Sequence, residues 1–152
     1  MTVSLENLIR TGQLKRHTPN AEETQRLLAA ARRNLHDAGV TQVSDELRFD
    51  AGYKAIMQCA LIGVMASGFR PATSVPGHQQ TMIQSLPLTL GVANDTWLVL
   101  DALRKKRNLN DYSGDLIDPE SLRECIERAT ELVAHVQRWL EKMHPELLAA
   151  ED

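Results

Sequence analysis

The chain has 152 residues, of which 43% are hydrophobic and 24% are charged, and its formal net charge is -3 at pH 7. This length suits a single domain with one core, and the apolar content excludes wholesale disorder. The slightly acidic balance gives no general case for nucleic-acid binding, so any such role must come from a local patch.

The sequence predicts neither a secretory leader nor a membrane span. Residues 1–15 lack a continuous apolar segment, so we expect no signal peptide. The most hydrophobic run, 55–66, is well short of the roughly 20 apolar residues that a span needs, so it predicts a buried helix. The two cysteines, Cys59 and Cys125, lie in apolar helical patterns and are expected to be buried, reduced thiols. We therefore expect a cytoplasmic protein with no membrane partner and no disulfide scaffold.

The first segment, 1–17, carries one short apolar cluster and then polar and basic residues, which predicts either a brief docked helix or a loose arm. The first long helix is predicted over 20–38, where apolar residues recur at helical spacing until a glycine ends the pattern. Its start has two interpretations. Either Thr18 caps the helix with Pro19 in the first position, or Asn20 is the cap.

The second helix is predicted over 44–67. Its second half is apolar on nearly every side, which is typical of a helix that others surround. Small residues along it would let a neighbouring backbone approach closely. The next segment, 68–91, contains three prolines and a short helical stretch around 78–86. We interpret it as an elaborated connection folded over one end of the helices.

Two further helices are predicted over 95–107 and 119–143. The first begins with apolar residues and ends in basic ones. The second is capped by Asp118 and opened by Pro119, and it keeps the helical period to its end.

One helical domain is therefore expected to fill most of the chain. No period-two strand pattern is present, so we expect no sheet. The predicted fold is all-α: an antiparallel four-helix up-and-down bundle over 18–144, with an extra short helix. An N-terminal arm, 1–17, precedes the bundle, and a C-terminal tail, 145–152, follows it.

The run 104–107, Arg-Lys-Lys-Arg, is the one dense basic patch in the sequence. One interpretation is a solvated helix end, where the negative end of the helix dipole favours cations. The other is a phosphate site, because Arg104 and Arg107 are three residues apart and share a helix face. Two guanidinium groups on one face can hold a phosphate bidentately. Asn108 follows directly, and Tyr112 lies one further turn along.

The order of these motifs resembles the HEPN (higher eukaryotes and prokaryotes nucleotide-binding) superfamily, particularly its small stand-alone bacterial members. The resemblance covers roughly residues 20–141. It rests on the Tyr53-x-Ala55 step in the core helix, the segments 68–71 and 75–78, and Arg107-Asn108 before the last helix. In that superfamily an Arg, a polar residue and a His four to six positions on form a ribonuclease motif. The resemblance implies an RNA- or nucleotide-binding homodimer, acting as a toxin or defence component beside a nucleotidyltransferase-like antitoxin.

One position departs from that motif. Tyr112 stands five residues after Arg107, where the motif has His, and no His lies between Asn108 and His135. A His with a pKa of about 6.5 can take and give a proton, whereas Tyr, at about 10, is mainly a hydrogen-bond donor at neutral pH. Two alternatives stay open: a metal-independent endoribonuclease with Arg107, Asn108 and Tyr112 as catalytic residues, or a protein that binds RNA without cleaving it. The Tyr favours the second.

Two other residues are candidates for the same site. His78 could join Arg104 and Arg107 in binding phosphate or RNA, and Asp111 could accept a proton; capping, core or salt-bridge roles are the alternatives. No metal-ligand spacing or Gly-rich phosphate loop is visible, so we expect neither metal nor cofactor. The alternative functions are a catalytically inactive helical protein-interaction module and a small-molecule pocket under residues 69–90.

Overall fold

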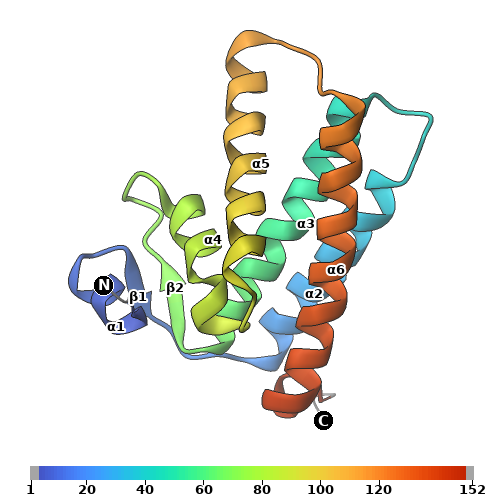
Figure 1. Ribbon diagram of the computed structural model, residues 1–152. Helices are drawn as coiled ribbons and strands as arrows, with labels where there is room; N and C mark the ends of the chain where they lie inside the picture. Colours follow the sequence, from blue (N-terminus) through green and yellow to red (C-terminus); the bar gives the residue numbers. More distant parts are fainter. Residues whose placement is uncertain (1–3, 150–152) are drawn as a thin grey trace.

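The computed structural model describes residues 4–149, which fold mainly into helices (Figure 1). The ends of the predicted arm and tail, 1–3 and 150–152, lie outside the described residues. In chain order the elements are α1 (Leu5–Arg10), β1 (Leu14–Arg16), α2 (Ala21–Ala38), α3 (Asp45–Ala66), β2 (Phe69–Pro71), α4 (His78–Thr89), α5 (Asn94–Ser113), α6 (Pro119–Met143) and the short 3-10 turn η1 (Pro145–Leu147).

Helices α2 and α6 begin where their capping residues predict. The side chain of Asn20 accepts a hydrogen bond from the Glu23 amide at 2.8 Å, which decides between the two possible starts of α2. The side chain of Asp118 accepts a hydrogen bond from the Ser121 amide at 3.0 Å, and Pro119 is the first residue of α6. Such caps satisfy amides that have no partner within the helix, so they fix the first turn.

Helix α3 is the centre of the core. It packs against α2, α4 and α6, and its buried side chains include Phe49 and Ile56. A Cβ atom at Gly63 would lie 2.9 Å from Leu90 Cγ and from Thr89 Oγ1. The missing side chain therefore lets the end of α4 approach α3 closely, as the small residues of this helix predict.

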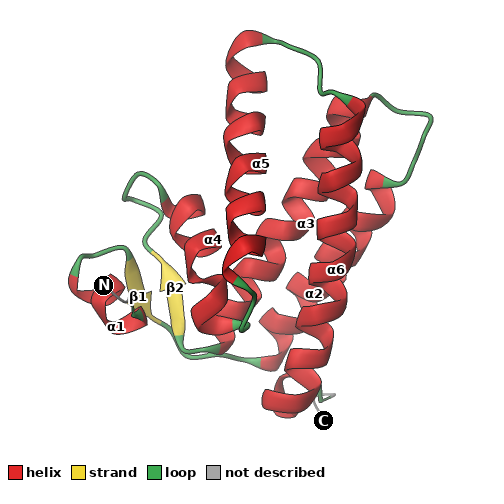
Figure 2. Cartoon of the chain, in the orientation of Figure 1, coloured by secondary structure: helices red, strands yellow, loops and turns green. Residues whose placement is uncertain are grey.

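The expectation of no sheet is wrong at one place. Strands β1 and β2 pair antiparallel, with Leu14 opposite Pro71 and Arg16 opposite Phe69 (Figure 2). Each strand is three residues long, too short to produce an alternating pattern that sequence analysis could detect. The pairing joins the N-terminal arm to the segment after α3, and Leu14 is buried there.

Helix α5 is longer than predicted. It continues past 107 to Ser113 and ends at Gly114, whose φ of 71° is in the left-handed region that glycine favours. The basic run therefore lies inside the helix rather than at its end, and no breaker stands between Asn108 and Ser113. The far half of α5 stands away from α6 in Figure 1, which leaves its surface open.

The chain after α6 turns back onto α2. Leu147 in η1 is buried, and the side-chain amide of Gln25 donates to the Leu147 and Ala149 carbonyls at 3.2 and 2.9 Å. Cys59 and Cys125 are buried and form no disulfide, as expected. Within residues 4–149, no helix is long and apolar enough to cross a membrane.

Candidate functional site

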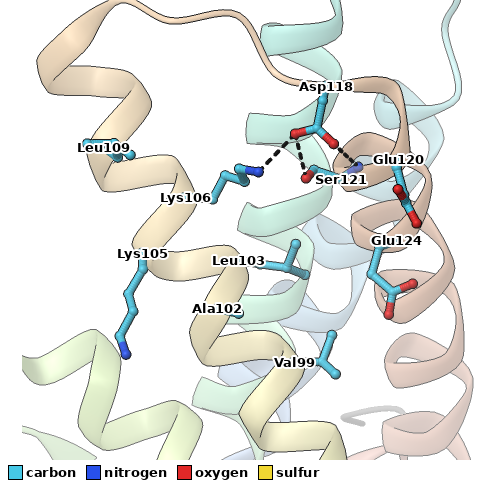
Figure 3. A pocket seen from close by; sticks show the side chains of 10 residues that line it. All are labelled: Val99, Ala102, Leu103, Lys105, Lys106, Leu109, Asp118, Glu120, Ser121 and Glu124. Carbon is cyan, nitrogen blue, oxygen red and sulfur yellow. Dashed lines mark hydrogen bonds and ion pairs between the residues drawn. The ribbon is translucent and has the colours of Figure 1, made fainter.

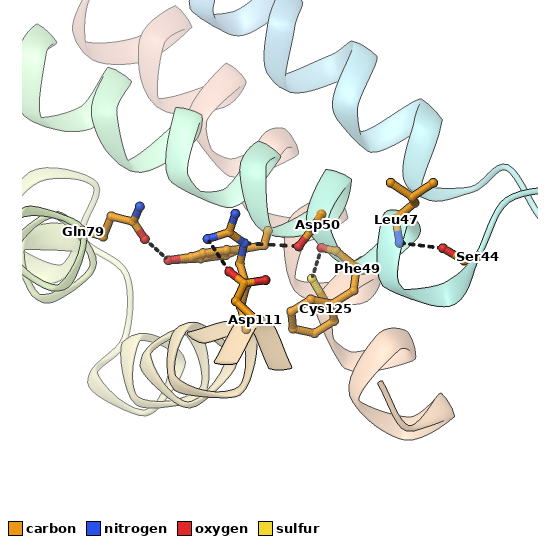
Figure 4. A network of polar contacts seen from close by, with 9 residues as sticks. Ser44, Leu47, Phe49, Asp50, Gln79, Asp111 and Cys125 are labelled. Carbon is orange, nitrogen blue, oxygen red and sulfur yellow. Dashed lines mark hydrogen bonds and ion pairs between the residues drawn. The ribbon is translucent and has the colours of Figure 1, made fainter. Parts of the chain in front are cut away.

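The side chain of Arg107 bridges α5 and α3. Its Nε donates to Asp50 Oδ1 at 3.2 Å, and its Nη1 lies 3.9 Å from Asp111 Oδ2, one turn further along α5. The guanidinium carbon lies 5.1 Å from the centre of the Tyr53 ring. Figure 4 shows Asp50 and Asp111 each joined by a dashed line to the same guanidinium group. The guanidinium group is thus held in one orientation while a third of the side chain stays exposed.

Tyr53 completes the network toward α4. Its hydroxyl donates to Gln79 Oε1 at 2.6 Å, the contact drawn at Gln79 in Figure 4. Its ring is buried. Burial raises the pKa of Tyr53 to about 12, because desolvation outweighs the opposing effect of the nearby Arg107 and Arg104 charges. The Tyr53 hydroxyl is therefore a hydrogen-bond donor held in place, and its ring packs against the Arg107 guanidinium group. With this pKa, Tyr53 cannot act as a proton acceptor near neutral pH.

A surface hollow of about 450 Å³ opens beside this network. Its lining includes Arg107, Tyr53 and Gln79, together with the exposed Lys54 of α3. This volume is within the range of small-molecule sites, about 300–1,000 Å³. A positively charged group held rigidly at the edge of such a hollow is suited to an anion of phosphate size.

Arg104 has a different role from Arg107. Its Nε donates to Asp101 Oδ1 at 2.8 Å, and the two side chains are only 15% and 10% exposed. Lys105 Nζ lies 3.5 Å from the other oxygen of Asp101. Because a buried carboxylate requires a partner, Arg104 serves to neutralise Asp101. The two arginines of the basic run therefore do not form a matched pair of free guanidinium groups.

The other residues predicted for the site are only partly brought together. Helix geometry, about 100° per residue, puts Asp111 on the same side of α5 as Arg107 and turns Tyr112 to another side. Tyr112 is 93% exposed. Asn108 is also exposed, one residue along from Arg107. His78 begins α4 half-buried, and its neighbour Gln79 is the residue that reaches the hollow.

Sequence reasoning missed Asp50 and Gln79 as members of this site. Asp50 is 57 residues before Arg107, and only the packing of α3 against α5 brings them together. No motif in the sequence around Asp50 could have indicated it. Among residues 4–149, no group of three His, Cys, Asp or Glu side chains is arranged to hold a metal ion.

A second hollow, of about 570 Å³, separates the far half of α5 from α6 (Figure 3). Lys106 crosses it to Asp118 at 2.9 Å, and this bond is the main reason that the pKa of Asp118 lies below its usual range. Val99, Leu103 and Leu109 supply apolar walls. Leu109 is 62% exposed, so this face of α5 presents apolar surface that the described chain does not cover.

Comparisons of the sequence and structure with family models, with curated proteins and with solved structures found no match.

Proposed function

We propose that this chain is a HEPN-like protein that binds RNA or a nucleotide phosphate through Arg107. The proposal rests on one observation: the Arg107 guanidinium group is held in a fixed orientation and is partly exposed at the edge of a hollow. In this proposal the four long helices form the antiparallel bundle of that superfamily. The basic run then supplies a phosphate ligand from within a helix rather than from a helix end.

The contacts of Arg107 suit exchange with a phosphate. Its bond to Asp50 fixes the guanidinium plane, while the longer contact to Asp111, at 3.9 Å, is easily given up. A phosphate entering from the hollow would take the Nη groups in place of Asp111, with two parallel N–H···O bonds. Asn108, exposed beside Arg107, could donate a further hydrogen bond.

The proposed protein binds RNA rather than cleaving it. A metal-independent ribonuclease needs a base for the 2′-hydroxyl and an acid for the leaving oxygen. Asp111, which lies outside the motif, is a counter-ion of Arg107 in the free protein, and Tyr112 faces another side of α5. We therefore place Arg107 and Asn108 in binding. The toxin or defence role, and a nucleotidyltransferase-like antitoxin as partner, follow from the resemblance alone.

The hollow between α5 and α6 favours a second candidate function, a helical protein-interaction module without catalysis. We propose that its occupant is a second copy of this chain. One wall carries Lys105 and Lys106, and the other carries Glu120 and Glu124. A two-fold pair would set the lysines of each copy against the glutamates of the other, around the apolar surface near Leu109.

The two candidates are separated by measuring RNA binding. Fluorescence anisotropy with a labelled single-stranded RNA at low and high salt should give binding that weakens as salt rises. Arg107→Ala should abolish most of that binding. Lys105→Ala should do less, because Lys105 is already near Asp101. No binding by the wild type at low salt, and no effect of Arg107→Ala, would favour the interaction module.

A further inference from the structure

Another surface hollow, of about 480 Å³, lies between α2 and α3 next to the one at Arg107. The two hollows share Asn34 from α2 and Lys54 from α3 in their linings. The two hollows therefore adjoin at these two residues, and we call them together the α2–α3 groove. Its floor follows the exposed face of α3, with Arg107 near one end and Arg33 near the other.

Two of the three cations along this groove have no ion-pair partner among the described residues. Arg33 and Lys54 are exposed, and within residues 4–149 neither forms an ion pair. The acidic residues of the lining are Asp37 and Asp50, and Asp50 is engaged with Arg107. Three positively charged groups thus follow one another along a groove in a chain whose net charge is negative.

Side-chain amides line the groove between these cations. Asn34 Nδ2 donates to Gln58 Oε1 at 2.7 Å, and Gln79 accepts from Tyr53 at the other end. Each amide keeps donor or acceptor capacity that its partner does not use, because an amide has two N–H groups and two oxygen lone pairs. Base edges in single-stranded RNA are recognised by groups of this kind.

We propose that the α2–α3 groove binds a single-stranded RNA segment of at least two nucleotides, with its backbone passing Arg107, Lys54 and Arg33 in that order. This inference rests on the proposed function and extends it from one phosphate to a chain of phosphates. A single nucleotide would fill one hollow and leave Arg33 without a ligand. The row of separate cations and the amides between them suit alternating phosphates and bases.

The test uses isothermal titration calorimetry with 5′-phosphorylated oligouridylates of one, two, four and eight nucleotides. The wild-type chain is compared with the double variant Arg33→Gln, Lys54→Gln. The matched control is Arg138→Gln, Lys142→Gln, which removes the same charge from two exposed positions on α6. Circular dichroism melting checks that all three proteins are folded.

Affinity should rise from one to four nucleotides. The groove variant should bind the tetranucleotide about four- to tenfold more weakly, roughly what two exposed ion pairs contribute. Its salt dependence should fall by a slope of about 0.7 for each phosphate contact removed. The control should bind within about twofold of the wild type.

Three results would overturn the inference. The mononucleotide could bind as tightly as the tetranucleotide, with binding weakened only by Arg107→Gln. That result would support the phosphate site at Arg107 and rule out RNA binding along the groove. If no oligonucleotide binds, both the phosphate site at Arg107 and the RNA-binding groove are ruled out. If polyglutamate of equal charge competes equally well with the tetranucleotide, the groove is a site for acidic peptides.

Discussion

The Arg107 guanidinium carbon lies 5.1 Å from the centre of the Tyr53 ring, and the Tyr53 hydroxyl is bonded to Gln79 at 2.6 Å. This relationship links α5, α3 and α4 at the edge of the Arg107 hollow. A cation over an aromatic face contributes about 0.5–1 kcal/mol at exposed sites. Its larger effect here is to hold the guanidinium group in the orientation that Asp50 also requires.

Two substitutions of Tyr53 should therefore differ. Tyr53→Phe keeps the ring under Arg107 and loses the bond to Gln79, so RNA binding should change by no more than about twofold, within the range of a weak hydrogen bond. Tyr53→Leu removes the ring and should weaken binding several-fold. Anisotropy titrations of both variants, after checking that each is folded, measure the difference. Equal losses in the two variants would mean that the hydroxyl, and not the ring, positions Arg107.

Asp101 should be a stability residue and not a binding residue. Asp101→Asn leaves the Arg104 guanidinium, 15% exposed, without its carboxylate, which should lower the free energy of unfolding by about 1–3 kcal/mol. Asp111→Asn is the control, because that carboxylate is 56% exposed and its contact with Arg107 is long, at 3.9 Å. Urea unfolding followed by circular dichroism compares the two. A stability loss for Asp111→Asn as large as that for Asp101→Asn would contradict this division.

The buried thiols make stability depend on pH in the alkaline range. Desolvation raises the pKa of Cys59 and of Cys125 from 9.0 to about 12. In the unfolded chain both thiols ionise near their ordinary value, so the folded state binds more protons between about pH 9 and 12. The free energy of unfolding should therefore fall as the pH rises through that window and be unaffected by these groups below it.

A thiol reagent such as dithionitrobenzoate checks the same burial at pH 8. Both cysteines should react in urea, and neither should react in the native protein faster than the chain unfolds. Rapid reaction of one thiol in the native protein would show that its burial is lost in solution. In that case replacing that cysteine with Ala should leave the fall in stability above pH 9 unchanged, because an exposed thiol contributes nothing to it.

Much of the fold could be predicted because its signals are local. The caps at Asn20 and Asp118 and the helical periods lie within a few residues of the helix ends that they determine. The end of α5 at Gly114 was missed because the basic run looked like a helix terminus. The pairing of β1 with β2 was missed because its partners, such as Leu14 and Pro71, are far apart in sequence and each strand is short.

The candidate site was only partly accessible to sequence analysis for the same reason. Arg107 could be singled out from its own motif, but Asp50 and Gln79 meet it only through packing of α3 and α4. The ion pair of Arg104 with Asp101 could not be predicted, because nothing in the sequence marks Asp101 as buried. Spacing alone places two arginines on one face, whereas burial decides which of them is available to a ligand.

The homodimer can be tested at the α5 surface. Leu109→Glu places a charge on the apolar face that lines the α5–α6 hollow, so it should convert a dimer to a monomer in light scattering at micromolar concentration. Met143→Glu is the matched control, since Met143 is 57% exposed, close to the 62% of Leu109, but lies at the end of α6. A wild-type chain that is monomeric at this concentration would contradict the dimer.

The last prediction concerns chemistry at position 112. Wild-type protein should bind RNA and cleave it slowly or not at all, because Tyr112 stands where the ribonuclease motif has the proton-transferring His. Tyr112→His installs such a group. Since position 112 faces away from Arg107 along a single α5, the new His can act on a phosphate held by Arg107 only from the second copy of a dimer.

Tyr112→His should therefore cleave labelled RNA, and the double variant Leu109→Glu, Tyr112→His should bind RNA without cleaving it. Asp111→His is the informative comparison, because position 111 shares the Arg107 face within one chain and would act without a partner. Cleavage by Tyr112→His that survives Leu109→Glu in a monomer would rule out the shared cleft. Robust cleavage by the wild type, lost in Tyr112→Phe, would instead assign the chemistry to the exposed tyrosine hydroxyl.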